Sequence, residues 1–160
     1  MIHAAACKNL PLDAGRVSSN RASAAMDDDA LWDAFSTASL PETEWTHRSH
    51  LRVAWMFSRR YSLDEAHLLM RVGIIRLNAA QGLVETPARG YHETITRVWL
   101  VLIRSLMKEF PAGSSPAFVD DAGAWLAREA LFRHYSRERL MGVEARAHFV
   151  DPDLEPLPAG

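Results

Sequence analysis

Two histidines stand three positions apart in the segment Trp-Thr-His-Arg-Ser-His-Leu, residues 45–51. If a helix begins here, His47 and His50 share one face, with Cβ atoms roughly 5–6 Å apart. The same face continues through apolar residues, so we expect both imidazoles to point to the interior. A third histidine, His92, stands in Gly-Tyr-His-Glu-Thr, residues 90–94, where another helix is expected to begin. The three imidazoles could meet if these two helices are neighbours.

Three converging imidazoles could hold one divalent metal ion. Imidazole is a good ligand of Zn, Fe and Ni, and three protein ligands with one open position are the usual layout of a catalytic metal site. We therefore expect His47, His50 and His92 to bind a divalent metal ion, Zn, Fe or Ni. Neutral ligands leave the charge of the ion uncompensated, which favours a small anionic substrate and either hydrolysis or oxygen chemistry.

Residues beside the histidines are candidates for supporting roles. Glu93 and Tyr91 are expected to assist proton transfer. Three residues are expected to line a pocket: Trp45, Thr96 and Trp99. Glu93 has a simpler interpretation, which we favour, because a carboxylate in the first turn of a helix can pair with Arg97 four positions later.

Two metal-free interpretations stay open. In the first, the histidines and aromatic residues line a pocket that binds a small molecule, and one histidine can act as a general base. In the second, the protein is a helical interaction module whose histidines only satisfy buried hydrogen bonds. A further histidine, His134, could come near a pocket together with Arg137 and Arg139, or could simply lie at a helix junction capped by Ser136.

The elements that position these residues are all expected to be helices. Apolar residues recur with helical spacing, and no run of alternating residues is long enough for a strand. Thr46 is a candidate N-cap, and Ser62 with Glu65 has the spacing of a capping box. Helices are expected at about 28–37, 47–60, 62–82, 91–110, 115–135 and 136–149. The sequence therefore predicts an all-α fold, an antiparallel bundle of five to six helices.

Composition limits the classes of function. The 160 residues carry a net charge of −2 with both signs mixed, which argues against nucleic acid as a partner. The best apolar stretch, residues 98–107, contains Arg104 and is shorter than the roughly 18 residues that span a bilayer. We expect a cytoplasmic protein without a membrane partner, which binds a small molecule and could form a homo-oligomer. Phosphate-binding, dinucleotide-binding and His-Glu-x-x-His motifs are absent.

The chain is expected to have three parts. Residues 1–25 lack periodicity and are expected to be a flexible extension, so that translation could begin at Met26. Residues 26–150 form the helical domain, and 151–160, which hold three prolines, form an extended tail. Within the domain, four arginines are expected to form a solvated basic face on the second helix: Arg48, Arg52, Arg59 and Arg60.

Four segments carry a resemblance to known proteins: residues 45–51, 90–96, 134–140 and 152–158. They resemble a family of uncharacterised small bacterial helical proteins with the motifs Trp-Thr-His-x-x-His-Leu and Gly-Tyr-His-Glu-Thr. The resemblance covers about residues 28–158, points to the same histidines and implies no particular reaction. The chain is also loosely similar to the DinB-like helical bundles, in which histidines on separate helices bind a divalent metal, although its His-x-x-His spacing differs from theirs.

Overall fold

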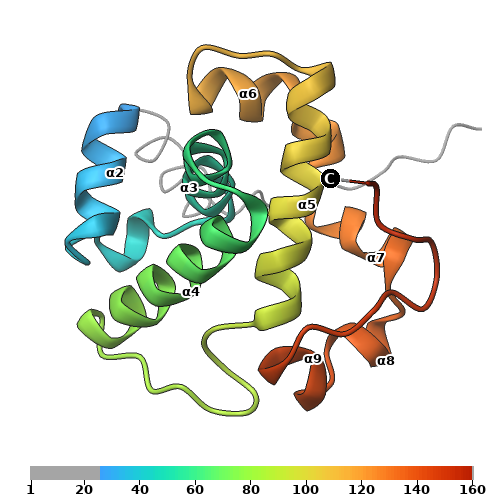
Figure 1. Ribbon diagram of the computed structural model, residues 1–160. Helices are drawn as coiled ribbons and strands as arrows, with labels where there is room; N and C mark the ends of the chain where they lie inside the picture. The colour runs from blue at the N-terminus through green and yellow to red at the C-terminus, as the bar shows by residue number, and fades with distance from the viewer. Residues whose placement is uncertain (1–25, 160) are drawn as a thin grey trace, which may run out of the picture.

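The computed structural model describes residues 26–159, and the regular secondary structure in this range consists of helices joined by loops (Figure 1). Its eight α-helices are α2 (Asp28–Ser36), α3 (His47–Arg60), α4 (Leu63–Ala80), α5 (Glu93–Glu109), α6 (Ser115–Asp121), α7 (Leu131–His134), α8 (Arg137–Leu140) and α9 (Val143–Ala147). Short 3-10 helices lie at Glu42–Glu44, Gly123–Trp125 and Arg128–Ala130. No strand occurs within residues 26–159, so the predicted all-α class is confirmed. In the same range no helix combines the length and the apolar character that crossing a bilayer requires.

The C-terminal half is more broken than expected. The helix predicted over residues 115–135 ends at Asp121 and is followed by two 3-10 helices before α7 begins. Gly123, two residues after the end of α6, is a poor helix former, and Ala127 has extended backbone with φ −63° and ψ 146°. A second break separates α8 from α9 at Gly142, which has extended backbone and serves as the N-cap of α9. The helix count therefore exceeds five or six, and the antiparallel arrangement stays a prediction.

Predicted caps set the beginnings of the helices that carry the site. The Thr46 N–H donates to Ser49 Oγ at 2.7 Å, and the Ser49 N–H donates to Thr46 Oγ1 at 3.3 Å. At α4 the Ser62 N–H donates to Glu65 Oε2 at 2.9 Å, while Ser62 Oγ accepts from the Glu65 N–H at 3.4 Å. Both are reciprocal capping boxes. The N-cap at Thr46 fixes the turn that carries His47 and His50.

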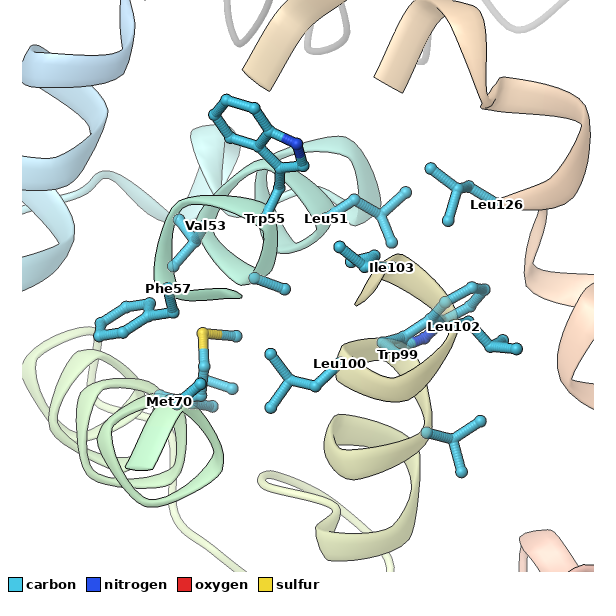
Figure 2. Packing of buried hydrophobic residues seen from close by; sticks show 14 of the residues in the cluster. Leu51, Val53, Trp55, Phe57, Met70, Trp99, Leu100, Leu102, Ile103 and Leu126 are labelled. Carbon is cyan, nitrogen blue, oxygen red and sulfur yellow. The ribbon is translucent and has the colours of Figure 1, made fainter. Parts of the chain in front are cut away.

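The apolar core lies where α3, α4 and α5 meet (Figure 2). Val53 of α3 and Leu100 and Ile103 of α5 are fully buried, and Met70 of α4 is 3% exposed. Leu126, from the irregular stretch after α6, packs against the same cluster. Burial of this apolar surface is the main favourable contribution to folding and holds α3 against α5.

Arg52 of α3 was expected in a solvated basic face, and this expectation is wrong. Its side chain is fully buried, because the start of α2 and the start of α6 cover this part of α3. Its Nη2 donates to the carbonyl of Met26 at 2.6 Å and to Asp28 Oδ1 at 3.1 Å, and its Nε donates to Ser115 Oγ at 2.8 Å. Ser115, the first residue of α6, also donates to Asp28 through its hydroxyl and its N–H. Two other arginines of α3 are exposed as expected: Arg59 and Arg60.

Gly73, in the middle of α4, faces the ring of Phe35 in α2. A Cβ atom at Gly73 would lie 2.4 Å from two carbons of that ring. We expect Gly73→Ala to destabilise the protein by about 1–3 kcal/mol through overpacking, although alanine is the better helix former. Urea unfolding followed by circular dichroism measures this change. Gly113→Ala is the control, since its Cβ would meet no atom within 4 Å, and equal stability of both variants would contradict the overpacking argument.

Residues 150–155 lie on α7 and α8 and are tied there through the backbone. The Leu154 N–H donates to the His134 carbonyl at 3.0 Å, and the Tyr135 hydroxyl donates to the Val150 carbonyl at 2.9 Å. The Ser136 N–H donates to Asp153 Oδ1 at 2.8 Å. The C-terminal tail therefore packs on the helical domain. The predicted N-terminal extension, residues 1–25, lies outside the described residues.

Candidate functional site

A pocket of about 500 Å³ opens between α3, α4, α5, α7 and α8, and we call it the histidine pocket. All three histidines predicted as a cluster line it: His47, His50 and His92. Tyr91, Thr96 and Trp99 also line it, as expected for the last two. Its other walls are mainly apolar: Leu51, Ala54, Met70, Ile74, Ile95, Leu131, Phe132, Leu140 and Met141. The structure therefore brings the predicted histidines to one cavity.

His47 is the first residue of α3 and is half-buried. Its Nε2 lies 2.8 Å from the carbonyl oxygen of Leu126, and its ring centroid lies 5.2 Å from that of Trp99. Because a carbonyl only accepts hydrogen bonds, Nε2 carries the proton and Nδ1 is left with its lone pair. Nδ1 has no hydrogen-bond partner within residues 26–159. His47 thus ties the start of α3 to the stretch after α6 and keeps one acceptor nitrogen.

His50 lies one turn further along α3. Its Nδ1 donates to the Thr46 carbonyl at 2.8 Å, so its Nε2 is the nitrogen with the lone pair, again without a partner in the described part of the chain. The ring stacks on Trp45, with centroids 3.6 Å apart. Trp45, expected as a pocket wall, is not among the residues that line the pocket; it supports His50 from the side and packs on Phe35.

His92 is the N-cap of α5. Its Nδ1 accepts from the Ile95 N–H at 3.3 Å, and its Nε2 donates to the Leu140 carbonyl at 3.0 Å. Both ring nitrogens are therefore used by backbone groups, and only 7% of the residue is exposed. The carbonyl partner also joins α5 to α8. His92 has the geometry of a residue that holds the pocket wall together.

The expected three-histidine metal site does not fit this hydrogen bonding. A metal ion needs a lone pair from each imidazole, and the only lone pair of His92 accepts the capping hydrogen bond of α5. In residues 26–159 no three histidine, cysteine, aspartate or glutamate side chains are grouped so that they could hold a metal ion. His47 and His50 keep one open nitrogen each. The divalent-metal site stays a prediction.

Burial keeps the pocket histidines neutral. It lowers the pKa of His47, and it lowers the pKa of His50 and of His92 from 6.5 to about 4. The cations of Arg128, beside His50, and of Arg146, beside His92, act in the same direction. All three side chains are therefore uncharged near neutral pH and present hydrogen-bonding groups instead of charge.

These pKa values predict how stability depends on pH. His50 and His92 have a pKa near 6.5 in the unfolded chain and about 4 in the folded protein. The unfolded state therefore binds more protons below 6.5, so stability is complete above this pH and is lost as the pH falls towards 4. Each histidine can contribute a slope of up to about 1.4 kcal/mol per pH unit.

Urea unfolding between about pH 7.5 and about pH 5 measures this slope. His92→Asn, which can still cap α5, should remove the contribution of His92 to this slope, so that the free energy of unfolding depends less on pH. A stability curve that is level across this range in the unmodified protein would contradict the burial of neutral histidines.

Two arginines supply the positive charge at the pocket. Arg128 begins a 3-10 helix and Arg137 begins α8; both are exposed and both line the cavity. The Arg137 guanidinium lies 5.2 Å from the ring centroid of Phe132, another lining residue. No aspartate or glutamate from the described residues lines the pocket. The charged side chains that line the pocket are therefore both positive.

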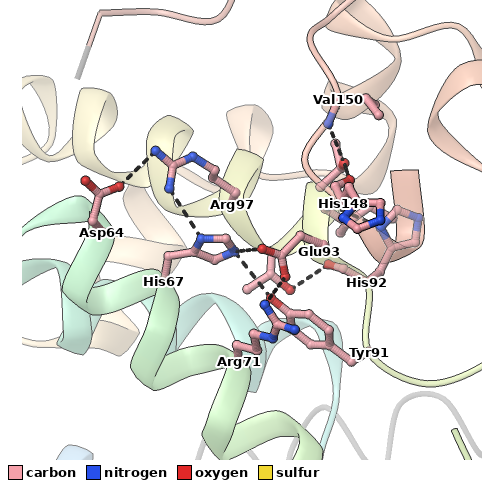
Figure 3. A network of polar contacts seen from close by, with 12 residues as sticks. Asp64, His67, Arg71, Tyr91, His92, Glu93, Arg97, His148 and Val150 are labelled. Atoms are coloured by element: carbon pink, nitrogen blue, oxygen red, sulfur yellow. Dashed lines mark hydrogen bonds and ion pairs between the residues drawn. The ribbon is translucent and has the colours of Figure 1, made fainter. Parts of the chain in front are cut away.

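A separate polar network lies behind Tyr91, between α4 and α5 (Figure 3). Arg97 Nη1 lies 3.3 Å from His67 Nδ1, and since arginine only donates, the His67 proton is on Nε2. This Nε2 lies 3.3 Å from the Tyr91 hydroxyl oxygen and 3.5 Å from Glu93 Oε1. Burial and the neighbouring Glu93 carboxylate raise the pKa of Tyr91. The Tyr91 hydroxyl therefore stays protonated, and its ring forms a wall shared by the network and the pocket.

Glu93 pairs with α4 and not with its own helix. Its Oε2 lies 3.6 Å from Arg71 Nη1, whereas Arg97 pairs with Asp64 at 2.9 Å. The favoured Glu93–Arg97 pair is therefore wrong, because the acidic and basic side chains of α4 offer both residues partners across the helix interface. Glu93 does not line the histidine pocket. Glu93 therefore has no direct contact with the cavity that would support its predicted role in proton transfer.

Two features of the site were missed from the sequence. His67 was given no role, although Asp64, His67 and Arg71 follow each other at three and four positions and thus share one face of α4. No pattern in the sequence pointed to Arg128, because this residue lies in a short 3-10 helix within the irregular stretch between α6 and α7. For the segment around His134 both interpretations hold in part: Arg137 lines the pocket, while Ser136 caps α8 by accepting from the Arg139 N–H at 3.2 Å.

Comparison of the chain with protein-family models, with curated proteins and with solved structures finds no match.

Proposed function

We propose that the protein binds a small, largely apolar organic anion in the histidine pocket. One observation carries the proposal: a cavity of about 500 Å³ is lined by apolar side chains, neutral histidines and two arginines, and by no acidic residue that the structure describes. Ligand pockets in proteins typically have 300–1,000 Å³, mostly apolar walls and a few well-placed polar groups. The size and the lining both agree with this class of site.

The walls favour a flat apolar body. Trp99 and Phe132 line the cavity together with Met70, and aromatic and thioether groups pack well against rings. These side chains come from three different elements, so a ligand between them would contact α4, α5 and α7 at once. An aromatic ring is therefore the ligand body that fits the lining best.

The polar groups favour an anionic end and a hydrogen-bond donor. Arg128 and Arg137 can donate to a carboxylate, sulfonate or phosphate, and no lining carboxylate competes for them. The open lone pairs of His47 and His50 can each accept a hydrogen bond, for example from a ligand hydroxyl. Because burial lowers the pKa of His50 to about 4, this histidine accepts hydrogen bonds but is a weak general base near neutral pH.

Two fluorescent probes test the preference for an anion. Anilinonaphthalene sulfonate and phenylnaphthylamine share an apolar body, and only the first carries a negative charge. We expect the sulfonate to bind saturably and Arg128→Ala to weaken it about fivefold, the size of one exposed ion pair near 1 kcal/mol. Binding of the neutral probe should be unchanged, because it does not use the arginine.

Lys108→Ala is the matched control, since it removes an exposed positive charge of α5 that does not line the pocket. It should leave the affinity of both probes unchanged. If Arg128→Ala and Lys108→Ala weakened the binding of the sulfonate equally, the loss would come from the net charge of the protein, and the proposed anion site would be contradicted. The same would follow if the neutral probe lost as much affinity as the sulfonate in Arg128→Ala.

A further inference from the structure

The outer face of α4 is apolar. Leu68, Val72 and Ile75 are 60%, 47% and 37% exposed, and with the exposed Ala79 they form a row that we call the α4 stripe. Figure 1 shows α4 with α3 and α5 beside it. The exposure of the stripe residues places them on the face of α4 that its own fold does not cover. Large exposed apolar side chains that are contiguous on one helix are typical of interaction surfaces.

The spacing of the stripe is that of a coiled-coil seam. Its members follow each other at four, three and four positions, which is the repeat that keeps apolar side chains facing a partner helix. The opposite face of α4 carries Met70, Ile74 and Leu77, which are buried in the core of the same chain. The helix thus has two apolar faces, and its own fold uses one of them.

Charges beside the stripe are self-complementary. Glu65 and Arg76 lie along the same edge, three helical turns or about 16 Å apart. When two copies of α4 pack antiparallel, Glu65 of each copy comes beside Arg76 of the other, twice by symmetry; parallel packing would put like charges together. The charges on the other edge pair within the chain, Asp64 with Arg97 and Arg71 with Glu93, whereas the hydrogen bonds of Glu65 to Ser62 use its Oε2 alone and leave Oε1 for a partner.

We propose that the α4 stripe is a homodimer interface, in which α4 packs antiparallel against α4 of a second copy of this chain. The contact is isologous, as the symmetry of a closed dimer requires. It is independent of the proposed ligand pocket, because Met70 and Ile74 face the pocket from the other side of the helix.

Sedimentation velocity of the full chain at increasing concentration tests the dimer. A single helix pair buries less than the roughly 800 Å² per partner of a standard interface, so we expect a dissociation constant on the order of micromolar. Val72→Glu should raise this constant at least tenfold. Val143→Glu is the matched control, because Val143 is a 63% exposed valine outside the stripe, and it should not change the constant.

Cross-linking tests the orientation. In a Cys7→Ser background, which removes the single cysteine of the chain, Glu65→Cys and Arg76→Cys variants are prepared separately and mixed, so that the mixed dimer keeps one of its two Glu65–Arg76 pairs. Antiparallel packing predicts disulfide-linked dimers that form mainly between the two variants, whereas parallel packing predicts dimers within each variant. A chain that is monomeric at all concentrations, a dimer unaffected by Val72→Glu, or cross-links only within each variant would each overturn the proposal.

Discussion

Replacing Arg52 with methionine is expected to destabilise the protein by about 3–5 kcal/mol, because removing one partner of a buried ion pair leaves the others without compensation. The variant loses the hydrogen bonds of Arg52 to Met26, Asp28 and Ser115, which join three helices. Burial alone would raise the pKa of Asp28, but hydrogen bonds from Ser115 and Arg52 outweigh it and lower that pKa. Urea unfolding followed by circular dichroism gives the free-energy difference.

Arg59→Met is the matched control for this prediction. It makes the same chemical change on the same helix, at an exposed arginine whose guanidinium lies 4.9 Å from the ring centroid of Trp55. We expect it to cost less than about 1 kcal/mol. If both variants were equally stable, Arg52 would contribute no more than a surface residue, and the account of how α2, α3 and α6 are joined would be wrong.

His92→Ala is expected to destabilise the protein by about 2–4 kcal/mol. Loss of the N-cap of α5 costs about 1 kcal/mol, and the Leu140 carbonyl left without its donor costs about 1–3 kcal/mol. Asparagine is a good N-cap residue, so His92→Asn should recover about 1 kcal/mol of this loss. The exposed His148, whose imidazole has no hydrogen bond to the described residues, is the control, and His148→Ala should have little effect on stability.

The same variants separate a cap from a metal ligand. Elemental analysis of protein purified without a histidine tag should give the same metal content for the unmodified protein and for His92→Asn. A bound divalent metal that is lost with His92→Asn, together with unchanged stability of the metal-free His92→Ala protein, would contradict the capping role and support the predicted metal site.

Local patterns predicted the parts of the fold that depend on neighbouring residues. Thr46 and Ser62 were identified as caps because the partner of a cap lies only three positions away. The face shared by His47 and His50 followed from the helical repeat in the same way. Arg52 could not be predicted to be buried, because what covers it comes from Asp28 and Ser115, which are far away in the sequence.

The chemistry of the site depends on contacts that the sequence does not encode locally. The apolar faces of two helices predicted that His47, His50 and His92 could meet if these helices are neighbours, and the structure brings all three to one cavity. The positions of distant carbonyl groups decide which ring nitrogens keep a lone pair without a partner. The Leu126 carbonyl accepts from Nε2 of His47, and the Leu140 carbonyl accepts from Nε2 of His92. These two carbonyls, together with the cap of α5, favour a pocket with neutral hydrogen-bonding groups, while the metal site stays a prediction.

The proposed function requires that the histidine pocket is a binding site. A side chain that fills the pocket tests this requirement most directly. Ala54 lines the cavity from α3, and a phenylalanine there would occupy part of the space where a ligand would lie. Titration of the unmodified protein and of Ala54→Phe with anilinonaphthalene sulfonate is the decisive measurement, with circular dichroism to confirm equal helix content. We predict one saturable site in the unmodified protein and at least about tenfold weaker binding in the variant, a loss of about 1.4 kcal/mol. Identical binding curves for the two folded proteins would contradict the account.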